Sequence, residues 1–71
     1  MATLFAFFGL DADLRLVEAY RGAIESRFRA EVQAIIRRCH GLRERERFTV
    51  CREALRLAYE SAVARGHALT A

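Results

Sequence analysis

Apolar residues recur at the period of an α-helix along two long stretches of the chain. In the first stretch, about residues 11–40, they are Val17, Tyr20, Ile24, Phe28, Val32, Ile35 and Cys39. In the second, about residues 44–65, they are Phe48, Cys51, Leu55, Ala58 and Ala62. Spacings of three and four keep side chains on one face of a helix. The pattern therefore predicts an all-α protein with two long helices.

A turn at about residues 41–43 separates the two predicted helices. Gly41 suits the end of the first helix, because glycine adopts the left-handed backbone that often follows a helix. Asp11 or Asp13 can cap its beginning by accepting backbone N–H bonds. We expect Gly66 to end the second helix and residues 67–71 to form a frayed tail.

Folding the chain at this turn gives an antiparallel hairpin in which the two apolar stripes face each other. In the register that matches best, Val32 lies opposite Ala58 and Phe28 lies opposite Ala62. Large side chains of the first helix then meet small ones of the second, which permits close packing. The sequence therefore predicts a closely packed hairpin over residues 11–66.

Both helices carry apolar surface beyond the seam of the hairpin. A helix that is apolar over most of its girth is buried on more than one side. The chain has only 71 residues, 54% of them apolar and none of them proline, and a monomer of this size is marginal. We therefore expect two hairpins to homodimerise into a four-helix bundle. The predicted dimer interface consists of Val50, Ala54, Leu57, Ser61, Ala64 and Leu16.

Residues 1–10 form an apolar N-terminal arm that contains Phe5, Phe7, Phe8 and Leu10. No basic segment precedes its apolar run, and the run is too short to span a bilayer, so we expect a cytoplasmic protein with no membrane partner. Two interpretations of the arm stay open. It packs across the dimer and completes the core, or it presents its phenylalanines to a partner protein, since aromatic residues often dominate binding.

Positive charge is concentrated around the predicted turn. The chain has a net charge of +3 and twelve arginines, with no lysine. Residues 37–52 hold six arginines and two glutamates, a local net of +4, whereas the rest of the chain has a net of −1. In one interpretation Arg43, Arg45 and Arg47 dock an acidic partner or nucleic acid. In the other, the turn is a solubilising tip with Glu–Arg side-chain pairs.

Candidate catalytic and metal-binding groups are few. The soft metal ligands are Cys39, His40, Cys51 and His67, and their spacing does not suit zinc. Cys39 and Cys51 should face each other, and we expect two buried thiols, with a disulfide as the alternative. No nucleophile lies in a recognisable setting and no glycine-rich phosphate loop is present. We therefore expect no metal, no cofactor and no enzymatic activity.

Two segments carry a resemblance to a known family: Leu14–Arg21, which reads Leu-Arg-Leu-Val-Glu-Ala-Tyr-Arg, and Arg52–Arg56, which reads Arg-Glu-Ala-Leu-Arg. With the Ala/Arg-rich composition, they make the chain similar to small two-helix early proteins of Pseudomonas phages, of the quorum-sensing anti-activator kind. The resemblance implies a dimer that binds a host protein, a LuxR-type transcription regulator, in the host cytoplasm. It would act as an inhibitor that occludes this regulator.

Two functional hypotheses follow. The first is a small dimeric protein-interaction module that binds and inhibits a host regulatory protein. The alternative is a nucleic-acid-associated regulator that uses the arginine-rich turn, and steep salt dependence would identify it.

Overall fold

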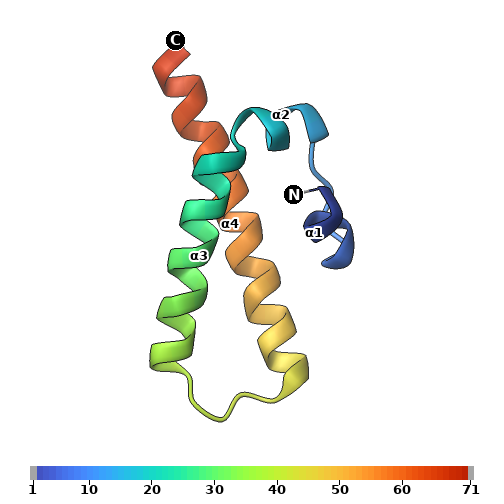
Figure 1. Ribbon diagram of the computed structural model, residues 1–71, viewed down its shortest axis with the longest axis vertical. Coiled ribbons are helices and arrows are strands. Elements are labelled where there is room, and N and C mark those ends of the chain that lie inside the picture. Colours follow the sequence, from blue (N-terminus) through green and yellow to red (C-terminus); the bar gives the residue numbers. More distant parts are fainter. Residues whose placement is uncertain (1, 71) are drawn as a thin grey trace.

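The computed structural model describes residues 2–70, including the side chains of residues 3–66. No strand occurs among these residues, and the helices are α1 (Ala2–Phe7), α2 (Leu14–Ala19), α3 (Arg21–Arg38) and α4 (Glu44–Thr70). α3 and α4 run antiparallel and pack along each other, while α1 and α2 lie beside this hairpin (Figure 1). The predicted all-α class is confirmed.

The first long helix is interrupted at Tyr20. This residue ends α2 and precedes α3, and its φ of −110° and ψ of 22° are not helical. Its N–H donates to the carbonyl of Leu16 and its carbonyl accepts from the N–H of Ile24, both at 2.9 Å. The backbone polar groups are therefore satisfied while the helix axis turns. The prediction of one helix over residues 11–40 is wrong, and the bend brings Val17 into the core.

The helix ends follow the local sequence. Asp13, one of the two residues predicted as the cap, caps α2, since its Oδ1 accepts from the N–H of Arg15 at 2.9 Å. α3 ends at Arg38, two residues earlier than expected. Gly41 in the following loop has a φ of 79°, a conformation that residues with a Cβ rarely adopt. α4 then begins at Glu44.

α4 continues past Gly66 to Thr70, so the predicted helix end at about residue 65 is wrong. Gly66 does not have the positive φ of a helix-ending glycine. A Cβ at this position would instead collide with the ring of Tyr20. The glycine therefore lets Tyr20 approach α4 closely. Residue 71 lies outside the described residues.

The hydrophobic core joins the arm, α2 and both helices of the hairpin. Its buried side chains are Phe5, Phe8, Val17, Ile24, Leu55, Ala58 and Ala62. Ile24 and Leu55, at the seam between α3 and α4, are fully buried. The core is therefore built within a single chain and includes two phenylalanines of the N-terminal arm.

The register of the hairpin differs from the prediction. Ala58 and Ala62 border a shallow hollow together with Ala23 and Arg27 of α3. In the predicted register these alanines faced Val32 and Phe28. Those residues lie more than one helical turn further along α3 than Arg27 and Ala23. Residues that pair across a hairpin are equidistant from its midpoint, and the predicted midpoint falls inside the first turn of α4. The loop that ends before Glu44 excludes that arrangement.

Truncation of Leu55 tests the assigned core. Leu55→Ala should lower the free energy of unfolding by about 2–5 kcal/mol, because it leaves a cavity at a fully buried position. Leu14→Ala is the matched control on α2, where the side chain is 57% exposed, and it should cost less than about 1 kcal/mol. Urea denaturation followed by circular dichroism measures both. Equal losses would contradict this core.

Candidate functional site

The N-terminal arm is attached to the hairpin by aromatic contacts. Phe5 meets Tyr59 of α4 edge to face, with ring centroids 5.6 Å apart. The ring centroid of Phe8 lies 6.5 Å from that of Phe28 of α3 and 5.1 Å from that of Phe48 of α4. The arm therefore touches both helices of the hairpin, and Phe8 bridges them.

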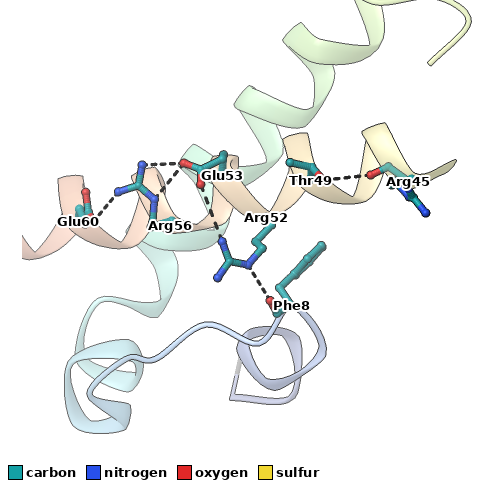
Figure 2. A network of polar contacts seen from close by, with 7 residues as sticks. All are labelled: Phe8, Arg45, Thr49, Arg52, Glu53, Arg56 and Glu60. Carbon is teal, nitrogen blue, oxygen red and sulfur yellow. Dashed lines mark hydrogen bonds and ion pairs between the residues drawn. The ribbon is translucent and has the colours of Figure 1, made fainter. Parts of the chain in front are cut away.

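A polar contact from α4 also holds the arm. Nε of Arg52 donates to the carbonyl of Phe8 at 3.0 Å (Figure 2). This carbonyl lies just after α1, where helix carbonyls lack partners within the helix. Nη1 of the same arginine lies 3.9 Å from Oε1 of Glu53. Arg52 thus connects the end of α1 to α4.

These contacts determine how exposed the arm residues of the predicted partner-binding set are. Phe5 and Phe8 are buried, and Leu10 is half-buried against the same core. Their side chains complete the hairpin of their own chain, so in this conformation they are not presented to a partner. Phe7 differs, because its side chain is 67% exposed. It is the phenylalanine of the arm that a partner can reach.

The side of α4 that faces away from the arm carries most of the predicted dimer interface. α1 and the residues around it contact α4 through Phe48, Arg52 and Tyr59. Val50 lies two residues from both Phe48 and Arg52, and Leu57 lies two residues before Tyr59. Two residues correspond to about 200° around a helix. Val50 and Leu57 therefore lie nearly opposite the arm.

Five of the six predicted interface residues share this side of α4. They follow one another at spacings of four, three, four and three, the spacing of a helix–helix seam. We call them the open strip: Val50, Ala54, Leu57, Ser61 and Ala64. Ala54 is buried within its own chain, while Leu57 is 48% exposed. The sixth predicted residue, Leu16, is half-buried on α2 and is not part of the strip.

Five exposed arginines surround the loop between α3 and α4. We call them the tip arginines: Arg37, Arg38, Arg43, Arg45 and Arg47. All the ion pairs found between the described side chains lie elsewhere, on Arg21, Arg27, Arg52 and Arg56. The predicted Glu–Arg pairs of a solubilising tip are thus not formed in the described part of the chain.

The two glutamates near the loop form no ion pair with the tip arginines among the described side chains. Glu44 and Glu46 lie in the first turn of α4, where the helix dipole favours negative charge. Side chains pair along a helix when they are three or four residues apart. Arg47 lies three residues after Glu44 and Arg43 lies three residues before Glu46, yet neither pair forms an ion pair among the described side chains. The excess positive charge of the tip is therefore exposed to solvent.

A separate ladder of charges runs along α4. Nη2 of Arg56 lies 2.6 Å from Oε2 of Glu53, and Nη1 lies 2.8 Å from Oε1 of Glu60 (Figure 2). The hydrogen bond from Arg56 lowers the pKa of Glu53, and the bonds to Glu53 and Glu60 raise the pKa of Arg56. Exposed pairs of this kind contribute little to stability. We assign the ladder a structural role on the helix surface.

The cysteines are free thiols in different environments. Cys39 is exposed, whereas Cys51 is half-buried and packs against the core. The expectation of two buried thiols is therefore wrong for Cys39, which lies just beyond the end of α3. Among the described residues, no group of three or more His, Cys, Asp or Glu side chains could hold a metal ion. The side chain of His67 lies outside the described set.

One groove was not predicted from the sequence. It has a volume of about 460 Å³ and lies between the arm and α3, with Leu4, Phe28 and Val32 as its apolar lining. Arg29 and Glu25 border it, together with Gln33. The groove depends on where the arm packs, which the spacing of residues along the chain does not specify.

Comparison with family models, curated proteins and solved structures gives no match for this chain. Within the described part of the chain, none of the helices is long and apolar enough to cross a membrane. The surfaces of the hairpin are therefore the features from which a function can be inferred.

Truncation of two adjacent phenylalanines tests the attachment of the arm. Phe8→Ala should lower the free energy of unfolding by about 3 kcal/mol or more, because the ring is buried between α3 and α4. Phe7→Ala removes the same atoms from an exposed position and should cost less than about 1 kcal/mol. Chemical denaturation at one protein concentration compares them. A larger loss for Phe7→Ala would show that the arm is packed differently.

Proposed function

We propose that this protein is a small dimeric protein-interaction module. Two chains pair through their open strips, and α3 and α4 of each chain form a four-helix bundle. The observation that carries the proposal is the open strip itself, a run of apolar and small residues on the side of α4 that faces away from the arm, in which Leu57 and Ala64 are exposed.

The composition of the open strip supports pairing between helices. Apolar residues at alternating spacings of three and four fit against a second helix with the same spacing. Leu57 supplies a large side chain that is half exposed in the single chain. Ser61 and Ala64, which follow it along the strip, are small and allow two helices to approach closely. A symmetric dimer uses the same strip on both chains.

The proposed partner of the dimer is a host regulatory protein. The resemblance of Leu14–Arg21 and Arg52–Arg56 to phage early proteins makes a LuxR-type transcription regulator the specific partner to test. In this proposal the dimer binds the regulator in the cytoplasm of the host and prevents it from engaging its operator. Recognition uses protein surface alone, with no catalytic step.

A second candidate function is supported by the tip arginines. Five exposed guanidinium groups without carboxylate partners among the described residues form a basic end of the hairpin. Arginine pairs well with phosphate oxygens, so this end could bind a nucleic-acid backbone. The protein would then be a nucleic-acid-associated regulator.

A charged side chain on the open strip should dissociate the proposed dimer into monomers. Leu57→Glu should give a folded monomer, because the side chain is half exposed in the single chain but buried in the dimer. Leu14→Glu places the same charge at an exposed leucine of α2 and should remain dimeric. Sedimentation equilibrium with circular dichroism measures both properties. A wild-type monomer at micromolar concentration contradicts the proposed bundle.

A gel-shift experiment separates the regulator hypothesis from nucleic-acid binding. Added to a LuxR-type regulator on its operator, the protein should release the DNA and should not retard the free operator. The triple variant Arg43→Ala, Arg45→Ala, Arg47→Ala is the control for direct DNA binding. If the wild-type protein retards DNA itself, and both salt and the triple variant abolish this, the alternative function is correct.

A further inference from the structure

We propose that Phe7, Phe48 and the tip arginines form one docking site for an acidic segment of a partner protein that also carries apolar side chains. This inference rests on the proposed function, because it names the chemistry of the module's partner. The site is distinct from the open strip. Phe48 lies on the side of α4 that contacts the arm, while the strip lies on the opposite side.

Three phenylalanine rings form a triangle at the centre of this site. The centroids of Phe7 and Phe8 are 5.1 Å apart, those of Phe7 and Phe48 are 5.7 Å apart, and those of Phe8 and Phe48 are 5.1 Å apart. Phe8 is buried and fixes the group to the core. Phe7 is 67% exposed and Phe48 is 41% exposed. The site therefore offers two exposed rings that are held in place from beneath.

Exposed aromatic rings of this kind suit a protein partner. Aromatic and arginine side chains are enriched where proteins bind each other, and they supply much of the binding energy. Covering Phe7 and Phe48 would remove apolar surface from water, which favours binding. The complementary feature of the partner is one or more apolar side chains that pack against the two rings.

Unpaired positive charge lies next to the rings. Arg45 precedes Phe48 by three residues, so the two residues are neighbours on the surface of α4. Its carbonyl accepts from Oγ1 of Thr49 at 3.1 Å (Figure 2), while its guanidinium group has no carboxylate partner among the described residues. The other tip arginines extend the positive field. Carboxylates of a partner would complement it, which makes the partner segment acidic.

The packing of the rings favours protein over nucleic acid. Bases bind aromatic side chains by stacking on an open ring face. Each ring of the triangle already packs against the two others, and Phe7 meets them at interplanar angles of 86° and 62°. Binding to a duplex through phosphates alone would leave both exposed rings in water. An acidic segment with apolar residues complements the rings and the arginines together.

A peptide-display selection on the full-length protein tests this proposal. A library of random 16-residue peptides is enriched on the immobilised wild-type chain, and fluorescence anisotropy then measures the affinity of the selected peptides. Peptides rich in Asp and Glu with interspersed apolar residues should be enriched. No enrichment, or enrichment of peptides without acidic residues, would overturn the proposal.

Three variants assign the binding to this site. Arg45→Glu and Phe7→Ala should each weaken peptide binding about tenfold or more, because each removes one of the two complementary features. Both side chains are exposed, so the variants should fold. Arg15→Glu reverses the charge of an exposed arginine on α2 and should bind as the wild type does. Equal affinity in all three variants would place the peptide elsewhere and refute the site.

Two further probes and one control complete the experiment. If a 30-base-pair duplex or phosphatidylserine vesicles bind more tightly than the peptides, and Arg45→Glu abolishes this, the site recognises phosphate instead and the proposal fails. Sedimentation of the same variants reports the dimer separately. A monomeric wild type that still binds acidic peptides through Arg45 would refute the proposed dimer and keep the docking site. A dimeric wild type that binds no acidic peptide would refute the docking site and keep the proposed dimer.

Discussion

The arrangement of this protein depends on the packing of Phe8 between the two long helices. Its ring contacts Phe28 of α3 and Phe48 of α4, and its carbonyl accepts from Arg52. A hairpin of two helices has two open sides, and this contact closes one of them with the chain's own arm. Phe8 belongs to the same core as Leu55, whose side chain is fully buried. The function of the protein then depends on the surfaces that remain.

Closure of one side makes the two sides of the hairpin different, as they are not in a simple two-helix protein. On the arm side, the same packing that buries Phe8 leaves Phe7 and Phe48 partly exposed near the basic tip. On the other side of α4, the open strip has the spacing of a helix–helix seam. The proposed dimer and the proposed docking site therefore occupy different sides of one helix. In this proposal, a partner binds without disturbing the pairing of the two chains.

Sequence periodicity was sufficient to predict the all-α class, the loop at Gly41 and the Asp13 cap, because each depends on local spacing or backbone preference. It could not locate the bend at Tyr20, since Val17, Tyr20 and Ile24 keep the helical spacing through it. The register was wrong by more than one turn because alanines offer little to distinguish one partner from the next. The unpaired state of the tip arginines did not follow from spacing, because Glu44 and Arg47 lie three residues apart, a distance that permits a pair. The burial of Phe5 and Phe8 required the three-dimensional placement of the arm.

The most direct test of this account is an isotope-filtered nuclear Overhauser experiment on a dimer assembled from labelled and unlabelled chains. The account predicts that the rings of Phe5 and Tyr59, whose centroids are 5.6 Å apart, show contacts within one chain only. The methyl groups of Val50 and Leu57 should show contacts between chains. Contacts between chains from Phe5, with none from Leu57, would show that the arm is exchanged between chains and that the open strip is not the interface.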